Sequence, residues 1–129
     1  MNYTMGDFMI RIKNAYMAHK RTVECVYSKP SLSLGKILVS NGYVEKIEET
    51  EVDGKKKLMV TLKYTKRMPA MNDVKIFSTP SLHLYIKKHE LPRKAREVGI
   101  HIVSTSKGIL SDDEAIKAGV GGKLLFQVQ

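Results

Sequence analysis

The sequence predicts an α+β fold, in which an N-terminal αβαββ lobe packs against a mostly β C-terminal lobe with one short helix. Apolar residues recur at helical spacing in two segments of the first half and alternate at a period of two in residues 58–64. The second half contains several short β-type runs between turn residues. The chain has 129 residues, 43% of them hydrophobic, which suits one compact unit or two small lobes.

The first helix is predicted from Thr4 to about Tyr16, because Phe8, Ile12 and other apolar residues follow one helical face. Asp7 stands three residues after Thr4, which resembles a capping box with Asp in place of Glu. The opposite face is polar, and it is either a solvated face or a set of phosphate contacts. Its residues are Arg11, Lys13 and Asn14.

A strand over residues 22–26 and a second helix reaching about Asn41 follow. Either Ser28 or Lys29 caps this helix, since Pro30 suits a first helical turn and disfavours helical geometry at the residue before it. Gly42 supplies the left-handed position after the helix.

Residues 44–64 predict a β-hairpin, with Asp53 and Gly54 in its turn. Three glutamates precede the turn and three lysines follow it, so we expect cross-strand pairing to neutralise most of this charge. These residues are Glu48, Glu49, Glu51, Lys55, Lys56 and Lys57.

Residues 66–73 lack periodicity and contain a proline, which predicts a linker between an N-terminal lobe of residues 1–65 and a C-terminal lobe of residues 74–129. Strands are expected near residues 74–77, 82–87, 100–104 and 124–128. The one helix of this lobe is well marked: Ser111 caps it, Glu114 completes a capping box and Gly119 ends it. Acidic residues at its start argue against phosphate binding there.

The charge favours a polyanionic partner, because 22 Lys and Arg against 13 Asp and Glu leave a net charge of +9. No apolar run reaches the ~18 residues of a membrane span, and the first residues lack a signal-peptide pattern, so we expect a cytoplasmic protein without a membrane partner. The single cysteine, Cys25, predicts a small buried hydrophobic residue.

Enzyme motifs are weak, so we expect no catalytic residues, metal, cofactor or small-molecule substrate. GVGGK at residues 119–123 fails the Walker pattern, and its glycines better suit tight turns and close backbone packing. Ser104 and Lys107 match the S-x-x-K of penicillin-recognising acyl enzymes, but the companion motifs are missing. The four histidines show no metal-site spacing.

With enzyme motifs weak, the function class that the sequence favours is recognition of RNA. Residues 75–107 carry seven basic residues against two glutamates, and the STSKG segment offers hydroxyls, an ammonium and an open backbone. Such a segment can enter the wide minor groove of A-form RNA and bind 2′-hydroxyls. Tyr85 either stacks on an unpaired base or belongs to the core.

The segment VSTSKGILSDDEAIKAGVGGK closely resembles the C-terminal signature of the bacterial-type small-subunit ribosomal protein S8 family. GDFMIRIKNA resembles the first helix of that family, SKPSLSLGKILVSNGYV its second helix, and FSTPSLHLYIKKHELP the segment before the signature. The resemblance covers essentially the whole chain.

This resemblance implies a structural constituent of the small ribosomal subunit that is a primary binder of its ribosomal RNA. The family docks on the central domain of that RNA, promotes its folding and assembly, and has other small-subunit ribosomal proteins as neighbours. By matching position, the implied RNA-binding residues are Ser104, Thr105, Ser106, Lys107, Gly108, Tyr85, Lys87, Lys88, Arg11, Lys13, Asn14, Ser28, Lys29, Gly121 and Gly122.

The sequence departs from the family pattern at Thr79, His83 and Ile86, which stand where relatives often carry basic residues, and at Pro30. Some phosphate contacts are therefore expected to be missing. The alternative function is a general architectural protein that binds double-stranded nucleic acid.

Overall fold

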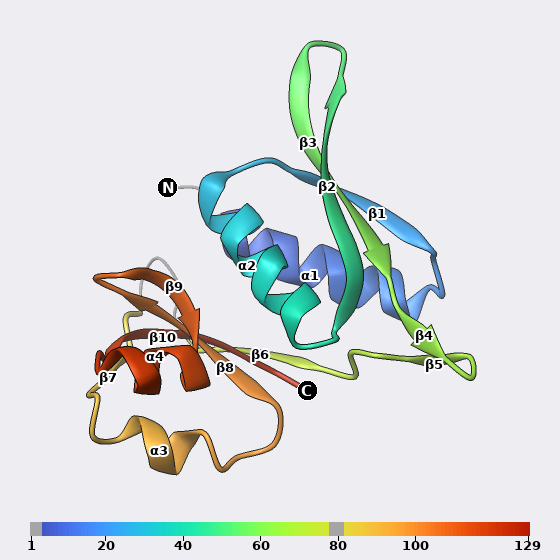
Figure 1. Ribbon diagram of the computed structural model, residues 1–129. Helices are drawn as coiled ribbons and strands as arrows, with labels where there is room; N and C mark the ends of the chain where they lie inside the picture. Colours follow the sequence, from blue (N-terminus) through green and yellow to red (C-terminus); the bar gives the residue numbers. More distant parts are fainter. Residues whose placement is uncertain (1–3, 78–81) are drawn as a thin grey trace. The chain divides into compact units, whose positions relative to one another are not determined.

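The computed structural model describes residues 4–77 and 82–129 (Figure 1). The described residues form an α+β structure, which confirms the predicted class. The chain divides into two compact units, Asn2–Asn72 and Asp73–Gln129, the latter together with Met1. The N-terminal unit has the predicted order of helix, strand, helix and two strands.

In the N-terminal unit, helices α1 (Thr4–Met17) and α2 (Lys29–Ser40) accompany an antiparallel sheet with the strand order β1-β3-β2. The strands are β1 (Thr22–Val26), β2 (Val44–Val52) and β3 (Lys55–Leu62). Apolar side chains of α1 are buried at the predicted helical spacing. The core residues of these elements include Phe8, Ile12, Leu34, Leu38, Leu58, Val60 and Leu62.

The start of α1 differs from the predicted capping box. Thr4 already lies within the helix. Asp7 instead accepts a hydrogen bond from Arg11, with 2.9 Å between Oδ2 and Nε, one helical turn further on. An acidic residue in the first turn still interacts favourably with the helix dipole.

The cap of α2 is Ser28 and not Lys29, the other candidate from the sequence. Its hydroxyl oxygen accepts the backbone N–H of Ser31 at 3.2 Å, and Pro30 lies in the first turn. At the other end, Gly42 has a φ of +77°, the left-handed geometry that the sequence predicted.

The β2–β3 hairpin has its turn at Asp53 and Gly54, both with positive φ, as predicted. The expected pairing of its charges was wrong for most of the residues. Only Glu51 and Lys56 face each other in the register, and the ammonium group of Lys56 lies 5.2 Å from the ring centroid of Tyr27. In the part of the chain that the structure describes, no ion pair joins the two strands.

The stretch expected as a linker, residues 66–73, contains local structure. Strands β4 (Tyr64–Thr65) and β5 (Met68–Pro69) form a small hairpin, whose turn residues Lys66 and Arg67 have positive φ. Met71 is only 2% exposed. Met71 is therefore a core residue, and residues 66–73 are not a solvent-exposed linker throughout.

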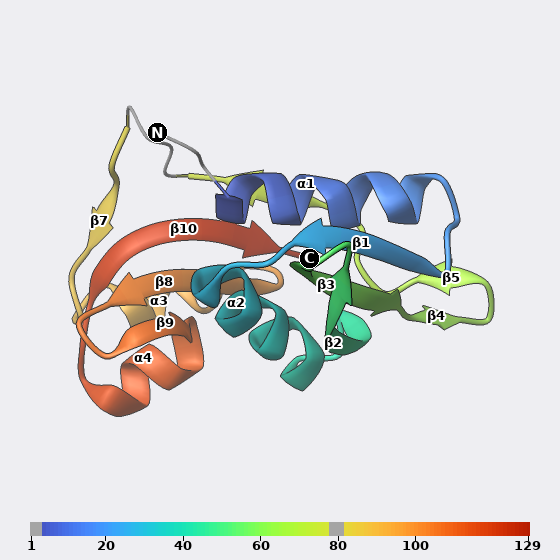
Figure 2. The same cartoon turned by 90° about the horizontal axis from the view of Figure 1, so that it is seen from above.

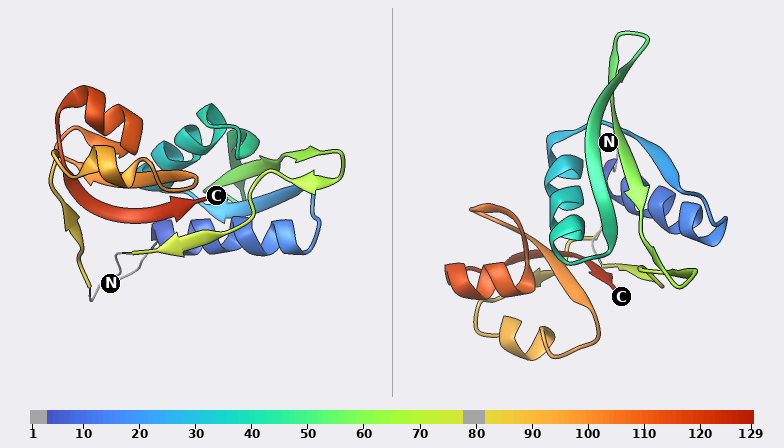
Figure 3. Two further views of the ribbon diagram at one scale, coloured as in Figure 1. Left: turned by 90° about the horizontal axis from the view of Figure 1, so that it is seen from below. Right: turned by 45° about the vertical axis from the view of Figure 1, so that its right-hand side comes forward.

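The C-terminal unit is built on a sheet with the strand order β6-β10-β8-β9, in which β7 also pairs with β10. Figures 2 and 3 show the long, curved β10 crossing this sheet. The strands are β6 (Val74–Ile76), β7 (Tyr85–Ile86), β8 (Ile100–Thr105), β9 (Gly108–Ser111) and β10 (Gly122–Val128).

Two helices pack on this sheet, α3 (Leu91–Lys94) and α4 (Asp112–Ala118), where the sequence predicted one. Leu91 of α3 and Ala115 of α4 share a buried cluster with Val103 and Leu124 of the sheet. This contact explains why the turn-rich segment before β8 forms a helical turn. Strand β9 was also not predicted.

Candidate nucleic-acid interface

The STSKG segment forms the end of β8, a two-residue turn and the start of β9, because Thr105 pairs with Gly108 across the turn. The Thr105 hydroxyl donates to the carbonyl oxygen of Gly108 at 2.8 Å and accepts the backbone N–H of Lys107 at 3.1 Å. Gly108 has a φ of +107°, which favours glycine. The Thr105 hydroxyl therefore holds the turn, and its one proton is not available to a ligand.

Ser106 and Lys107 stand at the tip of this turn and are exposed. Among the described residues, neither side chain has a hydrogen-bond or ion-pair partner. The turn thus presents one hydroxyl and one ammonium group on a backbone that is already fixed. A ligand can bind them without much loss of backbone conformational entropy in the protein.

A row of side chains crosses the sheet beside this turn. Lys123 of β10 is paired with Tyr85 of β7 on one side and with Ser104 of β8 on the other. Directly opposed residues point to the same face of a sheet. Tyr85 is 74% exposed, which excludes the core alternative for this residue.

Lys123 was not among the residues singled out from the sequence. The signal that would have identified it is the strand register, which places it between two residues that were singled out. That register joins segments about 20 and 40 positions apart, so local sequence patterns do not contain it.

Gly121 and Gly122 allow strands to approach closely. A Cβ atom at Gly122 would collide with the backbone carbonyl of Ser104, and one at Gly121 with the backbone around Ile86 and Lys88. These contacts confirm the prediction of close backbone packing for the GVGGK segment. The two glycines therefore bring β10 against the strands that carry Tyr85 and Ser104.

Helix α4 follows the turn hairpin and has the predicted cap. Ser111 accepts from the backbone of Glu114, whose side chain accepts the backbone N–H of Ser111, and Gly119 ends the helix with a φ of +69°. Three acidic residues occupy the first turn. The N-terminus of α4 is therefore not an anion site.

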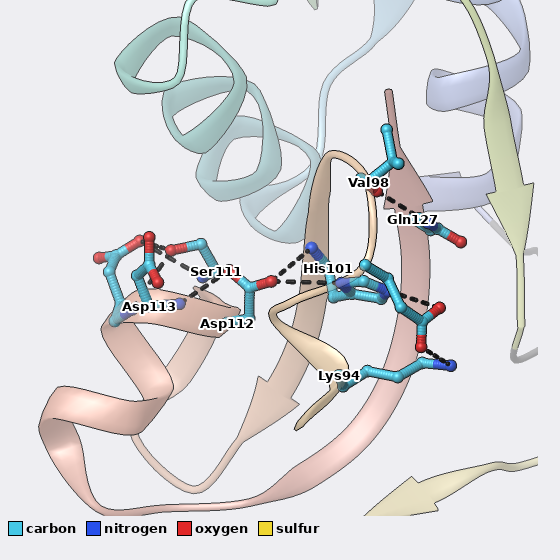
Figure 4. A network of polar contacts seen from close by, with 9 residues as sticks. Lys94, Val98, His101, Ser111, Asp112, Asp113 and Gln127 are labelled. Carbon is cyan, nitrogen blue, oxygen red and sulfur yellow. Dashed lines mark hydrogen bonds and ion pairs between the residues drawn. The ribbon is translucent and has the colours of Figure 1, made fainter. Parts of the chain in front are cut away.

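Asp112 has a role that the sequence did not indicate. It is 2% exposed, and its Oδ2 accepts the backbone N–H of His101 at 3.2 Å and lies 3.2 Å from the Nδ1 atom of the same residue (Figure 4). The other ring nitrogen, Nε2, lies 3.9 Å from Glu97 and has no hydrogen-bond partner. This buried pair fastens the start of α4 to β8.

In the N-terminal unit, Arg11 and Asn14 line a groove of about 330 Å³ between α1 and the start of β1, together with Lys20. The hydrogen bond that Arg11 donates to Asp7 is the main cause that raises the pKa of Arg11, and the negative charge of Asp7 adds to it. Lys13 is half-buried and is not part of the groove lining.

Ser28 and Lys29 lie at the start of α2, outside that groove. The Ser28 hydroxyl donates to the hydroxyl of Ser31 at 2.9 Å in addition to capping the helix, so its proton is already used. Lys29 is exposed. The structure therefore does not bring the five predicted residues of this unit together.

Lys87 and Lys88 are exposed between β7 and α3, and the Lys87 backbone N–H donates to Glu90. Among the departures from the family pattern, Ile86 packs against the core of the C-terminal unit, which explains its apolar side chain. His83 is exposed, whereas Thr79 lies outside the described residues.

The described residues give little support for a reactive cysteine, a metal site or a membrane-spanning helix. Burial raises the pKa of the Cys25 thiol to about 11, so this cysteine is a poor nucleophile and metal ligand. In residues 4–77 and 82–129, no three potential ligands gather into a metal site. No helix in those residues is long and apolar enough to cross a membrane.

Comparisons with known proteins agree on one family. The family model described as Ribosomal protein S8 matches residues 3–129. The small ribosomal subunit protein uS8 of Coprothermobacter proteolyticus is 41% identical over 127 residues, which cover 97% of this chain and 96% of the relative. The small ribosomal subunit protein uS8c of Guillardia theta is 37% identical over 129 residues, which cover 98% of each chain. The uS8 protein of Dictyoglomus turgidum is 41% identical over 124 residues, which cover 96% of this chain and 95% of the relative. The chain belongs to the ribosomal protein S8 family.

Proposed function

We propose that the protein is a structural constituent of the small ribosomal subunit that binds the central domain of its ribosomal RNA and promotes the folding of that domain. Membership of a family of structural ribosomal proteins, which are not enzymes, supports this function. The observation that carries it is the fixed β8–β9 turn, which leaves Ser106 and Lys107 open to a ligand.

The turn suits the minor groove of A-form RNA. That groove is wide and shallow and displays 2′-hydroxyls, which a serine hydroxyl can recognise and which DNA lacks. Lys107 and Lys123 supply charge for nearby phosphates, and Tyr85 offers an exposed ring for an unpaired base. The C-terminal lobe, residues 74–129, is thus the part that recognises RNA.

The N-terminal lobe, residues 1–65, adds contacts that are mainly electrostatic. Arg11 and Asn14 in the α1 groove, with exposed Lys29, are the side chains that suit phosphates. Ser28 contributes through its helix cap rather than through its hydroxyl proton. Other small-subunit ribosomal proteins are the remaining partners.

Titration of a central-domain RNA fragment at several salt concentrations tests this function. An arbitrary RNA duplex and a DNA duplex of equal length serve as controls. We expect affinity to fall with salt for every nucleic acid, while the central-domain fragment binds at least ~10³-fold more tightly throughout. Equal affinity for all three would instead support a general architectural protein.

A fluorescent penicillin or ester probe tests the acyl-transfer alternative. Ser104 lies within the sheet, paired with Lys123 and Ile109, and we expect no labelling of it. Labelling of Ser104 that is lost in Ser104→Ala would overturn the assignment to a binding protein.

A further inference from the structure

The basic residues between positions 75 and 107 fall into separate places in the C-terminal unit. Lys107 is at the tip of the β8–β9 turn, whereas Lys75 is on β6 and Arg93 and Lys94 are on α3. Arg96 lies two residues after the end of that helix. Figure 1 and the right-hand view of Figure 3 show the turn and α3 at opposite ends of this unit.

The side chain of Phe77 organises the second group. The ammonium nitrogen of Lys75 lies 5.3 Å from the centroid of its ring, and that of Lys94 lies 5.1 Å from it. The ring also stacks on buried His101, with 6.3 Å between centroids, and packs against the core cluster. Two ammonium groups are therefore held at one rigid support.

The positive charge of this surface exceeds the nearby negative charge. Glu97 bonds to Lys94 at 3.1 Å, and this hydrogen bond is the main cause that lowers the pKa of Glu97, with a smaller contribution from Lys75. Glu97 pairs with one of these ammonium groups, and Glu90 lies beside Arg93, so two carboxylates stand against four cations, Lys75, Arg93, Lys94 and Arg96. Arg93 and Arg96 are exposed and have no ion-pair partner in the described part of the chain.

We propose that this α3 surface, formed by Lys75, Phe77, Arg93, Lys94 and Arg96, binds the phosphate backbone of a second RNA segment. The inference rests on the proposed function and extends it. The surface offers two ammonium groups held at the Phe77 ring and two exposed guanidinium groups, and its one aromatic ring is covered by its own neighbours. It therefore suits phosphate groups and does not read bases. By binding RNA at two ends, the C-terminal unit ties two segments of one RNA together.

The test compares the triple variant Lys75→Gln, Arg93→Gln, Arg96→Gln with a matched control, Lys36→Gln, Lys55→Gln, Lys117→Gln. The control removes three exposed cations elsewhere. Lys94 is kept in both variants because it pairs with Glu97. Circular dichroism and thermal unfolding establish that each full-length variant folds as the unaltered protein does.

Two RNAs are used, the whole central domain and a short fragment containing only the helix that the unaltered protein protects most strongly. On the whole domain, we expect the α3 variant to reduce the slope of log affinity against log salt by about 2, with about tenfold weaker binding at moderate salt. Hydroxyl-radical footprinting should show loss of one protected segment and retention of the other. On the short fragment, the α3 variant should bind as the unaltered protein does.

Three results would overturn the inference: an equal slope change in the control variant, loss of both protected segments together, or an equal loss on the short fragment. Unchanged RNA binding with loss of an acidic protein partner would also overturn it, in favour of a protein contact. The proposed function fails separately, if the unaltered protein does not prefer central-domain RNA.

Discussion

Two serines at chain turns, Ser106 and Ser28, look equally suited to bind RNA in the sequence, yet their surroundings differ. The Ser28 hydroxyl accepts the backbone N–H of Ser31 as the cap of α2 and donates its proton to the Ser31 hydroxyl, so both its donor and an acceptor position are already used. Ser106 stands at the tip of a turn that the neighbouring Thr105 hydroxyl holds in shape. A hydroxyl is available to a ligand when a different residue satisfies the local backbone.

The two units also differ in how closely they gather the predicted RNA-binding residues. In the C-terminal unit, strand register places Tyr85, Lys123 and Ser104 in one row beside the turn. In the N-terminal unit, the predicted residues are dispersed between the α1 groove and the start of α2. We therefore expect RNA recognition from the C-terminal unit and mainly electrostatic contacts from the N-terminal unit.

The largest effect is expected from Gly122→Val, which disrupts the strand pairing that gathers the predicted residues of the C-terminal unit. The added side chain collides with the backbone of Ser104 and forces β10 away from β8, at a cost of about 3 kcal/mol in the free energy of unfolding. Chemical denaturation measures this loss. Gly54, at the tip of the β2–β3 hairpin, has a φ of +76° but open space where a Cβ atom would stand, and Asn tolerates this backbone geometry, so Gly54→Asn is a control with a much smaller expected loss.

The next effect separates the two serines. Ser106→Ala should weaken binding of central-domain RNA by ~1–3 kcal/mol, because an RNA partner is left unpaired, without changing stability. Ser28→Ala should cost about 1 kcal/mol of stability and leave affinity nearly unchanged. Lys94→Ala should weaken binding less than Ser106→Ala. Equal losses of affinity for the three variants would contradict a special role for the turn.

A smaller effect is expected from Lys123→Gln. Removing one phosphate contact from the row should reduce the salt slope by about 0.7–0.9 and leave the preference for central-domain RNA intact. Lys117→Gln on α4 is the matched control, and its salt slope should stay that of the unaltered protein. A lost preference with an unchanged slope would show that Lys123 reads bases.

The smallest effect is expected from Asp7→Asn. The exposed Asp7–Arg11 pair contributes less than ~0.5 kcal/mol, so thermal unfolding should hardly change. Freeing Arg11 should slightly strengthen RNA binding at low salt if the α1 groove faces phosphates. Weaker binding would show that Asp7 is needed to orient Arg11.

Local chemistry explains which parts of the fold were predictable. The caps at Ser111 and Gly42 and the Asp53–Gly54 turn depend on neighbouring residues, so the sequence contains their signals. The charge pairing in the β2–β3 hairpin was mispredicted because register, not composition, decides which residues face each other. Strand β9 and helix α3 depend on contacts with distant elements, which no local pattern records.

The candidate site shows the same limit. The STSKG motif drew attention to the β8–β9 turn, but not to the hydrogen bonds that already occupy the Thr105 hydroxyl. Lys123 and the buried His101–Asp112 pair follow from pairing across the sheet and from the packing of α4. Motifs identify functional segments, while tertiary contacts decide which atoms in them are free.

The central claim is that the β8–β9 turn recognises RNA through the open hydroxyl of Ser106. Acylation of 2′-hydroxyls along the whole small-subunit RNA, with saturating unaltered protein or Ser106→Ala, tests it directly. We predict that the unaltered protein protects one group of 2′-hydroxyls in a central-domain helix, and that Ser106→Ala selectively loses this group. Identical protection by both proteins, or protection scattered over the whole RNA, would contradict the claim.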